Sequence, residues 1–281
     1  MKTNTKRKIV NQIMLTLTFL CAAVALVPLF SIFAYVISRG ISSINLDFFT
    51  HLPKPVGEAG GGMANAILGS LILIGLASAW AIPVGIMGGV YLAEFGSHKS
   101  ALLIRFTADV MTGIPSIVVG MFAYLLFVLP LKSFSAFSGA FALGFMMTPL
   151  IMRTTEEIVK TVPQTLREAA LALGINRFQT TLHIVIKTAM GGIVTGILLS
   201  IARVAGETAP LLFTAFGNRF WQHGLNEPIA ALPLQIFIYA ISPYDDWHRQ
   251  AWAGALVLIS MVFLTTLITR LFTRSKISHV V

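Results

Sequence analysis

The stretch AILGSLILIGLASAWAIPVGIMGGVYLA (residues 66–93) decides the fold class, because it contains no Asp, Glu, Lys or Arg. A helix over these residues is long enough to cross the hydrocarbon core of a membrane, which is about 30 Å thick. The whole chain of 281 residues is 56% hydrophobic and 11% charged, with a mean hydropathy of +0.82. An ordinary soluble domain is about 25% charged. The sequence therefore predicts an integral membrane protein.

Similar apolar runs recur along the chain and predict six membrane spans. They cover approximately residues 13–37, 66–93, 108–129, 137–154, 188–214 and 251–271. These runs lack the alternation of polar and apolar residues that marks the strands of a membrane β-barrel. The predicted fold class is therefore all-α, a polytopic membrane protein with six transmembrane helices.

The basic residues predict the orientation of these spans. If the N-terminus is cytoplasmic, most of the 20 Lys and Arg residues fall on the cytoplasmic side, and Arg203 alone lies inside a span. The positive-inside rule then places both termini in the cytoplasm. The net charge of +9 follows from this distribution, and no basic stripe with interleaved aromatics suggests nucleic-acid binding. The first apolar run exceeds the length of a signal-peptide core, so we expect an uncleaved anchor.

The spans divide the chain into three parts. We expect an N-terminal unit over residues 1–65, made of a tail, the first span and an external loop. A core follows over residues 66–271, with a cytoplasmic loop at about 153–187, and a short tail covers 272–281. The external loop 38–63 is predicted to be flexible. The second external loop, 215–250, carries Trp, His and Arg side chains that suit either the membrane interface or a docking partner.

Catalytic chemistry finds little support in the sequence. The six His residues are scattered, and none forms a helical pair beside a Glu as in zinc hydrolases. The single Cys21 forms neither an internal disulfide nor a cysteine metal cluster. Asp109 and Glu207 are the plausible carboxylates within spans, and neither has the context of a catalytic site. We therefore predict no metal site and no cofactor, and an embedded enzyme is the unfavoured alternative.

Helix-breaking residues punctuate the spans. Pro83 lies in the second span, Pro115 in the third, and Gly206 and Pro210 in the fifth. Such residues are tolerated in membranes where neighbouring helices or a cavity satisfy the freed backbone groups. Close helix packing and a transport path built on broken helices both account for them, and both interpretations stay open.

The loop RTTEEIVKTVPQTLREAALALGINRFQTTLHIVIK (153–187) is long for a connection and predicts two short helices divided at Gly174. Each predicted helix carries an apolar face at helical spacing. The apolar positions are Leu166, Ala169, Ala170 and Leu173 in the first helix, and Phe178, Leu182 and Val185 in the second. By periodicity alone, this loop suits docking onto a partner or lying on the membrane or on its own spans.

Five positions in this loop resemble a family motif. Glu168, Ala169, Ala170, Gly174 and Ile184 match the pattern EAA-x3-G-x9-I of ATP-binding-cassette (ABC) importer permeases, before the penultimate span. The family pattern normally finishes with Leu-Pro, and this chain has Ile186 and Lys187 instead. The resemblance implies a binding-protein-dependent permease in which these five residues dock a cytoplasmic ATPase and transmit its closure.

Three further stretches are similar to one of the two permeases of phosphate-specific import systems, the A-type permease. They are SIARVAGETAPLLFTA (200–215), GGGMANAILGS (60–70) and TGIPSIVVGMFAY (112–124). The resemblance covers residues 60–281 and implies the type I importer permease fold in the bacterial cytoplasmic (inner) membrane, in contact with lipid. It also implies a heterodimer with a sister permease (the C-type permease), a dimer of the phosphate-system ATPase, an external phosphate-binding protein and inorganic phosphate as the transported ion.

The fifth span carries a predicted polar stripe at helical spacing. Its members are Gly196, Ser200, Arg203, Glu207, Pro210 and Thr214. In one interpretation Arg203 and Glu207 form a buried ion pair that fixes the helix register. In the other, Arg203 donates charge-assisted hydrogen bonds to a passing oxyanion while Glu207 orients it. The family resemblance favours the second interpretation, with Ser200 and Thr208 beside the same path, and phosphate or another oxyanion as the cargo.

Overall fold

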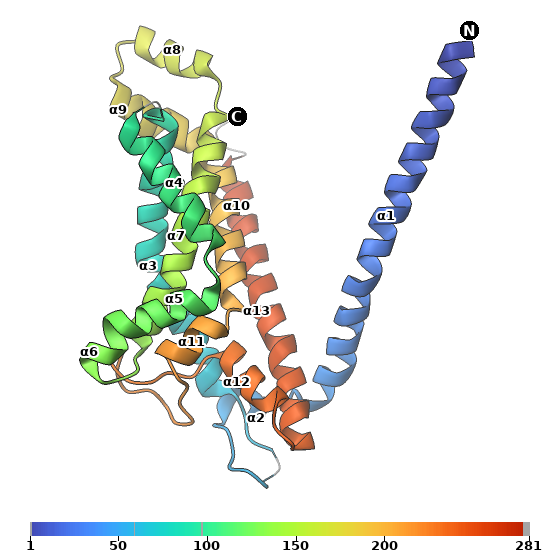
Figure 1. The fold of residues 1–281 in the computed structure, drawn as a ribbon, viewed down its shortest axis with the longest axis vertical. Helices are drawn as coiled ribbons and strands as arrows, with labels where there is room; N and C mark the ends of the chain where they lie inside the picture. The colour runs from blue at the N-terminus through green and yellow to red at the C-terminus, as the bar shows by residue number, and fades with distance from the viewer. Residues whose placement is uncertain (1, 59, 97, 278–281) are drawn as a thin grey trace.

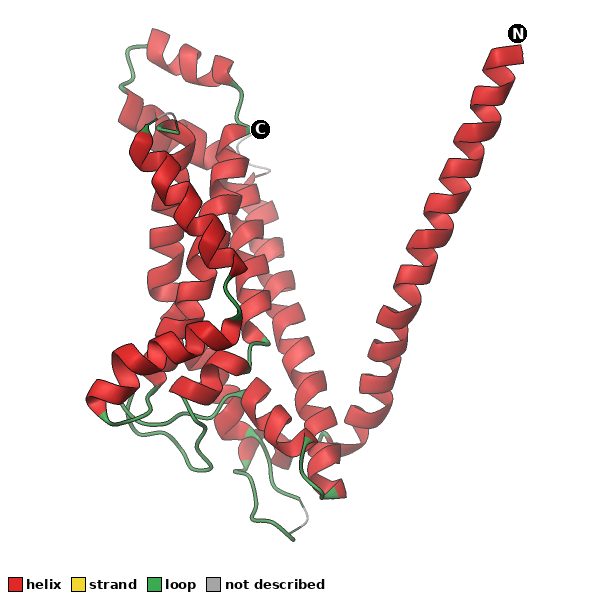
Figure 2. Ribbon diagram, in the orientation of Figure 1, coloured by secondary structure: helices red, strands yellow, loops and turns green. Residues whose placement is uncertain are grey.

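The computed structural model describes residues 2–58, 60–96 and 98–277, and the described chain is helical, without a β-strand (Figure 2). The membrane-length helices are α1 (Lys2–Gly40), α3 (Ala64–Glu94), α7 (Ala136–Lys160), α10 (Ile186–Ala205) and α13 (Asp245–Ile277). The shorter α-helices are α2 (Leu46–Thr50), α4 (Lys99–Gly113), α5 (Ser116–Ala123), α6 (Leu129–Leu131), α8 (Gln164–Ala172), α9 (Arg177–Thr180), α11 (Ala209–Thr214) and α12 (Leu232–Ala240). A 3-10 turn, η1 (Ile41–Ser43), and two π-helical turns, η2 (Tyr124–Val128) and η3 (Thr181–Val185), complete the set.

The helices form a bundle with α1 standing apart from it (Figure 1). We call the end where α1 begins and α13 finishes the terminal end, and α8 and α9 lie there too. At the opposite end lie α2, α6, α12 and the long loops, and there α1 meets α13. Among the described residues, five helices are long and apolar enough to span a membrane, or up to six if the bent pair α4–α5 counts as one span. The all-α prediction is therefore confirmed, and the predicted six spans are reached only when the bent pair is counted as the third span.

The third predicted span, 108–129, is wrong as a single helix. The chain forms α4 and then turns by 105° at residues 114 and 115, so that the helical run from Ser116 to Leu131 leaves in a new direction. Ile114 has extended backbone angles, φ −71° and ψ 128°. This is the conformation that a following proline favours, because the proline ring clashes with a helical residue before it. Pro115 is thus a true break, and α5 is free to pack across the bundle.

The fifth predicted span, 188–214, also differs from the structure. It stops at Ala205, Gly206 follows as the C-cap, and α11 begins three residues later at Ala209. Pro210 sits in the first turn of α11, where its missing N–H is not needed. The polar stripe is therefore wrong as one continuous helical face, because the helix ends in the middle of it.

Two predicted loops also contain more order than expected. The loop 38–63 includes α2, whose Phe48 is buried, and Met63 at its end is fully buried. The loop 215–250 includes α12, an apolar helix that packs against α13. At the terminal end, α7 extends to Lys160, so the connection starts later than the predicted residue 153.

Glycines bring the central helices close together. A Cβ on Gly85 would come within 2.7 Å of Ile151, and one on Gly89 within 2.5 Å of the backbone oxygen of Met152. These contacts join α3 to α7, and α3 continues unbroken through Pro83. Close packing therefore accounts for these two glycines, while Pro83, predicted as a helix breaker, does not break its helix. The core around this interface includes Leu73, Leu143, Met147, Ile151 and Leu211.

Candidate functional site

The candidate site lies where α10 ends and the chain turns into α11. Arg203 is on the last turn of α10, and its side chain is exposed on the surface of the chain. Glu207 and Thr208, in the turn itself, are half-buried. The Glu207 backbone N–H donates to Val204 O at 3.1 Å, and the Thr208 hydroxyl lies 3.5 Å from Pro233 O at the start of α12. The turn thus presents one cation, one carboxylate and one hydroxyl beside a helix end.

The bend after α4 supports this turn from the other side. A Cβ on Gly120 of α5 would lie 2.7 Å from Pro210 Cα, so α5 packs directly on the first turn of α11. Only glycine allows this approach, because any larger side chain would have to displace backbone. The two breaks at Pro115 and Gly206 therefore pack against each other through α5 and α11.

The other stripe residues face the protein interior. Ser200 is fully buried, and its Oγ has no hydrogen-bond partner among the described residues. Gly196 approaches Thr154 of α7, and Thr214 is buried with its hydroxyl donating to Pro210 O at 2.8 Å. In this conformation Ser200 therefore packs in the helix interface, whereas Arg203 stands at the chain surface.

The predicted ion pair between Arg203 and Glu207 is absent in this conformation. Within the described ranges, the Arg203 guanidinium makes no ion pair with a carboxylate, for which the limiting N···O separation is 4.0 Å. The reason is the helix end: the two residues are one turn apart only if the helix continues through Gly206. Among the described residues, this conformation therefore contains neither an ion pair that fixes the register of a continuous helix nor the contact by which Glu207 was expected to orient Arg203.

A second charged centre lies near the terminal end and was not predicted. Glu156 of α7 is 0% exposed. Its carboxylate accepts hydrogen bonds from Arg105 Nη2 of α4 at 2.6 Å, Arg153 Nη1 at 2.7 Å and Lys160 Nζ at 2.5 Å. Arg153 also reaches Asp109 Oδ1 at 3.0 Å. The cluster joins the middle of α4 to the last turns of α7.

Part of this cluster has a sequence signal. Arg153, Glu156 and Lys160 are spaced by three and four residues, which places them on one face of a helix. Arg105 has no such signal, because it comes from another helix. Asp109, predicted as a carboxylate inside a span, proves to be 53% exposed and paired with Arg153.

Glu156→Gln is expected to destabilise the protein by about 3 kcal/mol, since removing the buried centre of the ion network leaves Arg105 and Lys160 without their carboxylate partner, whereas Arg153 keeps Asp109. The amide keeps the shape of the side chain but loses the charge that holds three cations. The measurement is the thermal unfolding midpoint of the purified chain in mild detergent. Glu157→Gln is the matched control, because Glu157 is the exposed neighbour on the same turn. Equal midpoints for the two variants would contradict the expectation.

The loop between α7 and α10 folds largely as predicted. α8 ends near Gly174, whose φ of +78° is left-handed, and Asn176 then caps α9 by accepting from Gln179 N at 2.8 Å. Glycine adopts a left-handed φ without steric cost, which explains its place at this helix end. α9 is not a separate helix, because η3 carries it directly into α10.

The motif residues of this loop have different surroundings. Glu168, Ala169 and Gly174 are exposed, Ile184 is half-buried and Ala170 is buried. Among the large apolar side chains of the loop, Leu173 and Phe178 are the most exposed, at 81% and 74%. The loop therefore holds an apolar surface away from the body of the chain, at the terminal end (Figure 1).

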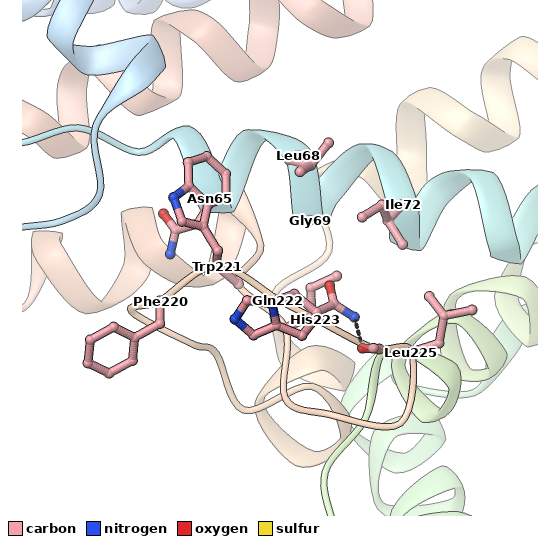
Figure 3. Close-up of a pocket in the computed structure, with 12 residues that line it drawn as sticks. Asn65, Leu68, Gly69, Ile72, Phe220, Trp221, Gln222, His223 and Leu225 are labelled. Carbon is pink, nitrogen blue, oxygen red and sulfur yellow. Dashed lines mark hydrogen bonds between the residues drawn. The ribbon is translucent and has the colours of Figure 1, made fainter.

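A pocket of about 200 Å³ lies at the opposite end, between the start of α3 and the loop that follows α11. Figure 3 shows Asn65 of α3 beside Trp221, Gln222 and His223 of that loop. Asn65 Nδ2 donates to Asn218 O at 2.6 Å and ties the loop to α3. The predicted docking or interface loop is thus a formed surface, with Phe220 73% exposed at its edge.

Comparison with known proteins assigns the fold to a class. Residues 81–278 match the family model described as binding-protein-dependent transport system inner membrane component. In inward-facing crystal structures of the MetNI methionine ABC transporter, one chain superposes with a TM-score of 0.60, covering 76% of this chain and 96% of that chain. The identity is 16%, so this likeness concerns the fold alone.

Curated relatives agree over nearly the whole chain. The phosphate transport system permease protein PstA of Haemophilus influenzae is 41% identical, covering 98% of this chain and 100% of the relative. PstA of Xylella fastidiosa is 45% identical, covering 98% of this chain and 96% of the relative. PstA of Yersinia pestis is 44% identical, covering 95% of this chain and 90% of the relative.

The family model and the relatives define a multi-pass transport permease and not an enzyme, since the relatives are named as transport permeases. The chain belongs to the family of binding-protein-dependent transport system inner membrane components, the permeases of ABC importers, and within it to the PstA group.

Proposed function

We propose that this chain is one half of the translocation path of an ATP-driven inorganic phosphate importer in the bacterial inner membrane. The other half is a sister permease, an ATPase dimer supplies the energy and an external binding protein delivers phosphate. The PstA relatives support the choice of phosphate. The observation that carries the proposal is Arg203, a surface cation without a described carboxylate partner, next to a break in a membrane helix.

The cost of such a cation favours a function. A charge at the centre of a membrane costs at least about 2.5–3.5 kcal/mol on insertion scales, and intramembrane charges face water or protein rather than lipid. Arg203 lies 16 residues after Lys187, which corresponds to about 24 Å along a helix. Lys187 marks the cytoplasmic boundary in our proposed orientation, so Arg203 lies past the middle of the membrane. We therefore place it on a water-filled path shared with the sister permease.

The chemistry of Arg suits a phosphate path. A guanidinium presents a planar fork of donors that matches two oxygens of an oxyanion, and its charge strengthens both hydrogen bonds. Glu207 and Thr208 lie in the adjoining turn. The Glu207 carboxylate repels an anion, and Thr208 offers a single hydroxyl, so the anion is held only weakly. A path needs only enough attraction to admit the ion and must release it again. The binding protein supplies the affinity.

The loop at the terminal end serves as the ATPase contact in this proposal. Glu168, Ala169 and Gly174 offer an exposed surface, and Leu173 and Phe178 add apolar area that a partner would bury. Ala170 is buried and Ile184 is half-buried, so in this proposal they hold the loop against the start of the α10 helix and do not touch the ATPase. The terminal end is then cytoplasmic, in agreement with the positive-inside distribution. The units 1–65, 66–271 and 272–281 follow as anchor, permease core and tail.

Uptake of labelled ions tests the proposal. The tagged chain is purified in mild detergent with its associated proteins and reconstituted into vesicles with ATP. We expect a second permease and an ATPase to co-purify, and phosphate uptake to require both ATP and the binding protein. Uptake of sulfate or molybdate in place of phosphate would identify a different oxyanion importer. Recovery of a homodimer alone would overturn the assembly, and phosphate uptake without an ATPase would overturn the mechanism.

A further inference from the structure

Arg167 in α8 joins the exposed loop to the body of the chain. Its Nη1 donates to Glu94 Oε1 at 2.5 Å, and its Nη2 donates to Val159 O at 3.1 Å. The Arg167 and Glu94 side chains are only 15% and 20% exposed, and the Arg167 Nε is buried as well. Neither residue belongs to the loop motif, and the proposed path does not use them.

The two acceptors sit at two helix ends. Glu94 is the last residue of α3, and Val159 lies in the last turn of α7. The carbonyl groups in the last turn of a helix lack intrahelical donors and carry partial negative charge, so a cation is favourable there. The guanidinium fork of Arg167 thus holds α3 and α7 together at their ends and attaches α8 to both.

The side of α8 that carries Arg167 faces the body of the chain. Arg167 and the buried Ala170 are three residues apart, which places them on one face of the helix. Their neighbours Glu168 and Ala169 are exposed. A force applied to the exposed face of α8 therefore reaches α3 and α7 through Arg167.

From α7 the packing continues to the candidate path. A Cβ added at Gly192 of α10 would lie 2.5 Å from Ile158 of α7, and one added at Gly196 would lie 2.5 Å from Thr154. Such contacts leave no slack, so a displacement of α7 moves α10 as well. Arg203 lies at the far end of α10.

We propose that the Arg167–Glu94 ion pair is the mechanical tie that carries ATPase closure from α8 into α3 and α7, and so to Arg203. This inference rests on the proposed function, because it assumes that α8 contacts an ATPase. Arg167 and Glu94 are positioning residues: they touch neither phosphate nor, in this proposal, the ATPase.

The test uses the complete reconstituted importer and the ratio of phosphate imported to ATP hydrolysed. For Arg167→Gln and Glu94→Gln we expect this ratio to fall by about tenfold, because losing one charge-assisted hydrogen bond shifts the equilibrium between attached and detached α8 by about that factor. Co-purification of the ATPase and its basal ATP hydrolysis should stay at wild-type levels. Lys99→Gln is the matched control, because it removes an exposed positive charge at the start of α4, outside the loop proposed to meet the ATPase, and should leave the ratio unchanged.

Two further variants distinguish a tie from a general loss of stability. The double variant should be no worse than either single variant, because both remove the same interaction. Arg167→Lys should restore part of the ratio, since an ammonium reaches Glu94 but cannot bridge two acceptors with a planar fork.

Several outcomes would overturn the inference. A wild-type ratio in both single variants would show that the Arg167–Glu94 ion pair does not carry ATPase closure, and it would leave the proposed function intact. Loss of the ATPase from Arg167→Gln, with Glu94→Gln unaffected, would show that Arg167 contacts the ATPase directly. A wild-type complex that imports no phosphate would overturn the proposed function together with the inference.

Discussion

Arg203→Gln is expected to abolish phosphate uptake by the reconstituted importer while membrane insertion, assembly and basal ATP hydrolysis remain. The glutamine keeps hydrogen-bonding capacity but lacks the charge that offsets the dehydration of a phosphate ion. Because the structure gives Arg203 no described carboxylate partner, its removal leaves no carboxylate unpaired in this conformation. Uptake of labelled phosphate and the composition of the purified complex are the two measurements.

Three comparisons separate this role from a structural one. Arg39→Gln, at an exposed Arg near the end of α1, should import phosphate normally and is the matched control. Arg203→Lys should recover uptake only partly, because a point charge does not present the two-donor fork. If Arg203→Gln combined with Glu207→Gln restored uptake, the pair would be structural in another conformation, and the path role would be overturned.

Gly174→Asp is expected to uncouple transport from ATP hydrolysis. A Cβ at Gly174 would meet no atom within 4 Å in this chain, and its φ is +78°. The added carboxylate would therefore project from the loop beside Leu173, on the surface proposed to meet the ATPase. We expect normal insertion, with either loss of the ATPase on purification or, if the ATPase stays bound, loss of its stimulation by the binding protein.

Gly174→Asn is the matched control for charge. Asn and Asp are nearly equal in size, and both tolerate the left-handed conformation better than other non-glycine residues do. If the Asn variant is less defective than the Asp variant, the effect is due to the added charge. If the two variants are equally defective, the effect is due to the bulk of the side chain at the docking surface. If Gly174→Asp and a bulky Ala169→Trp both left coupling intact, the loop would have no role at the ATPase.

The spans were predictable because hydrocarbon imposes one simple demand, a long apolar helix with its hydrogen bonds made internally. The breaks within the spans were harder to predict from the sequence. Pro115 indicated a break, but its 105° direction depends on the contact between Gly120 and Pro210, which are far apart in the sequence. Gly206 and Pro210 were likewise identified as helix-breaking residues, but the predicted fifth span ran through both, so the end of α10 at Ala205 was not located. Helical periodicity cannot reveal where a helix stops when the next helix has the same composition.

The candidate site shows the same division. The loop motif is local, so Gly174 was correctly placed at a helix end by sequence alone. Arg203 was identified as an unusual charge, but its separation from Glu207 required knowledge of the backbone between them. Arg105 and Glu156 are 51 residues apart, and Arg167 and Glu94 are 73 apart. Such pairs depend on how the helices pack, which no local pattern records.

The isolation of α1 bears on how the protein is made. This helix has 39 residues, and only 6% of its apolar window is buried against the rest of the chain. Its backbone polar groups are bonded within the helix, so lipid alone satisfies it. Because α1 precedes the bundle in the chain, the ribosome delivers it to the bilayer before any helix of the bundle exists. It needs no folded neighbour at that moment, and it fixes the growing chain in the membrane while the later helices find one another.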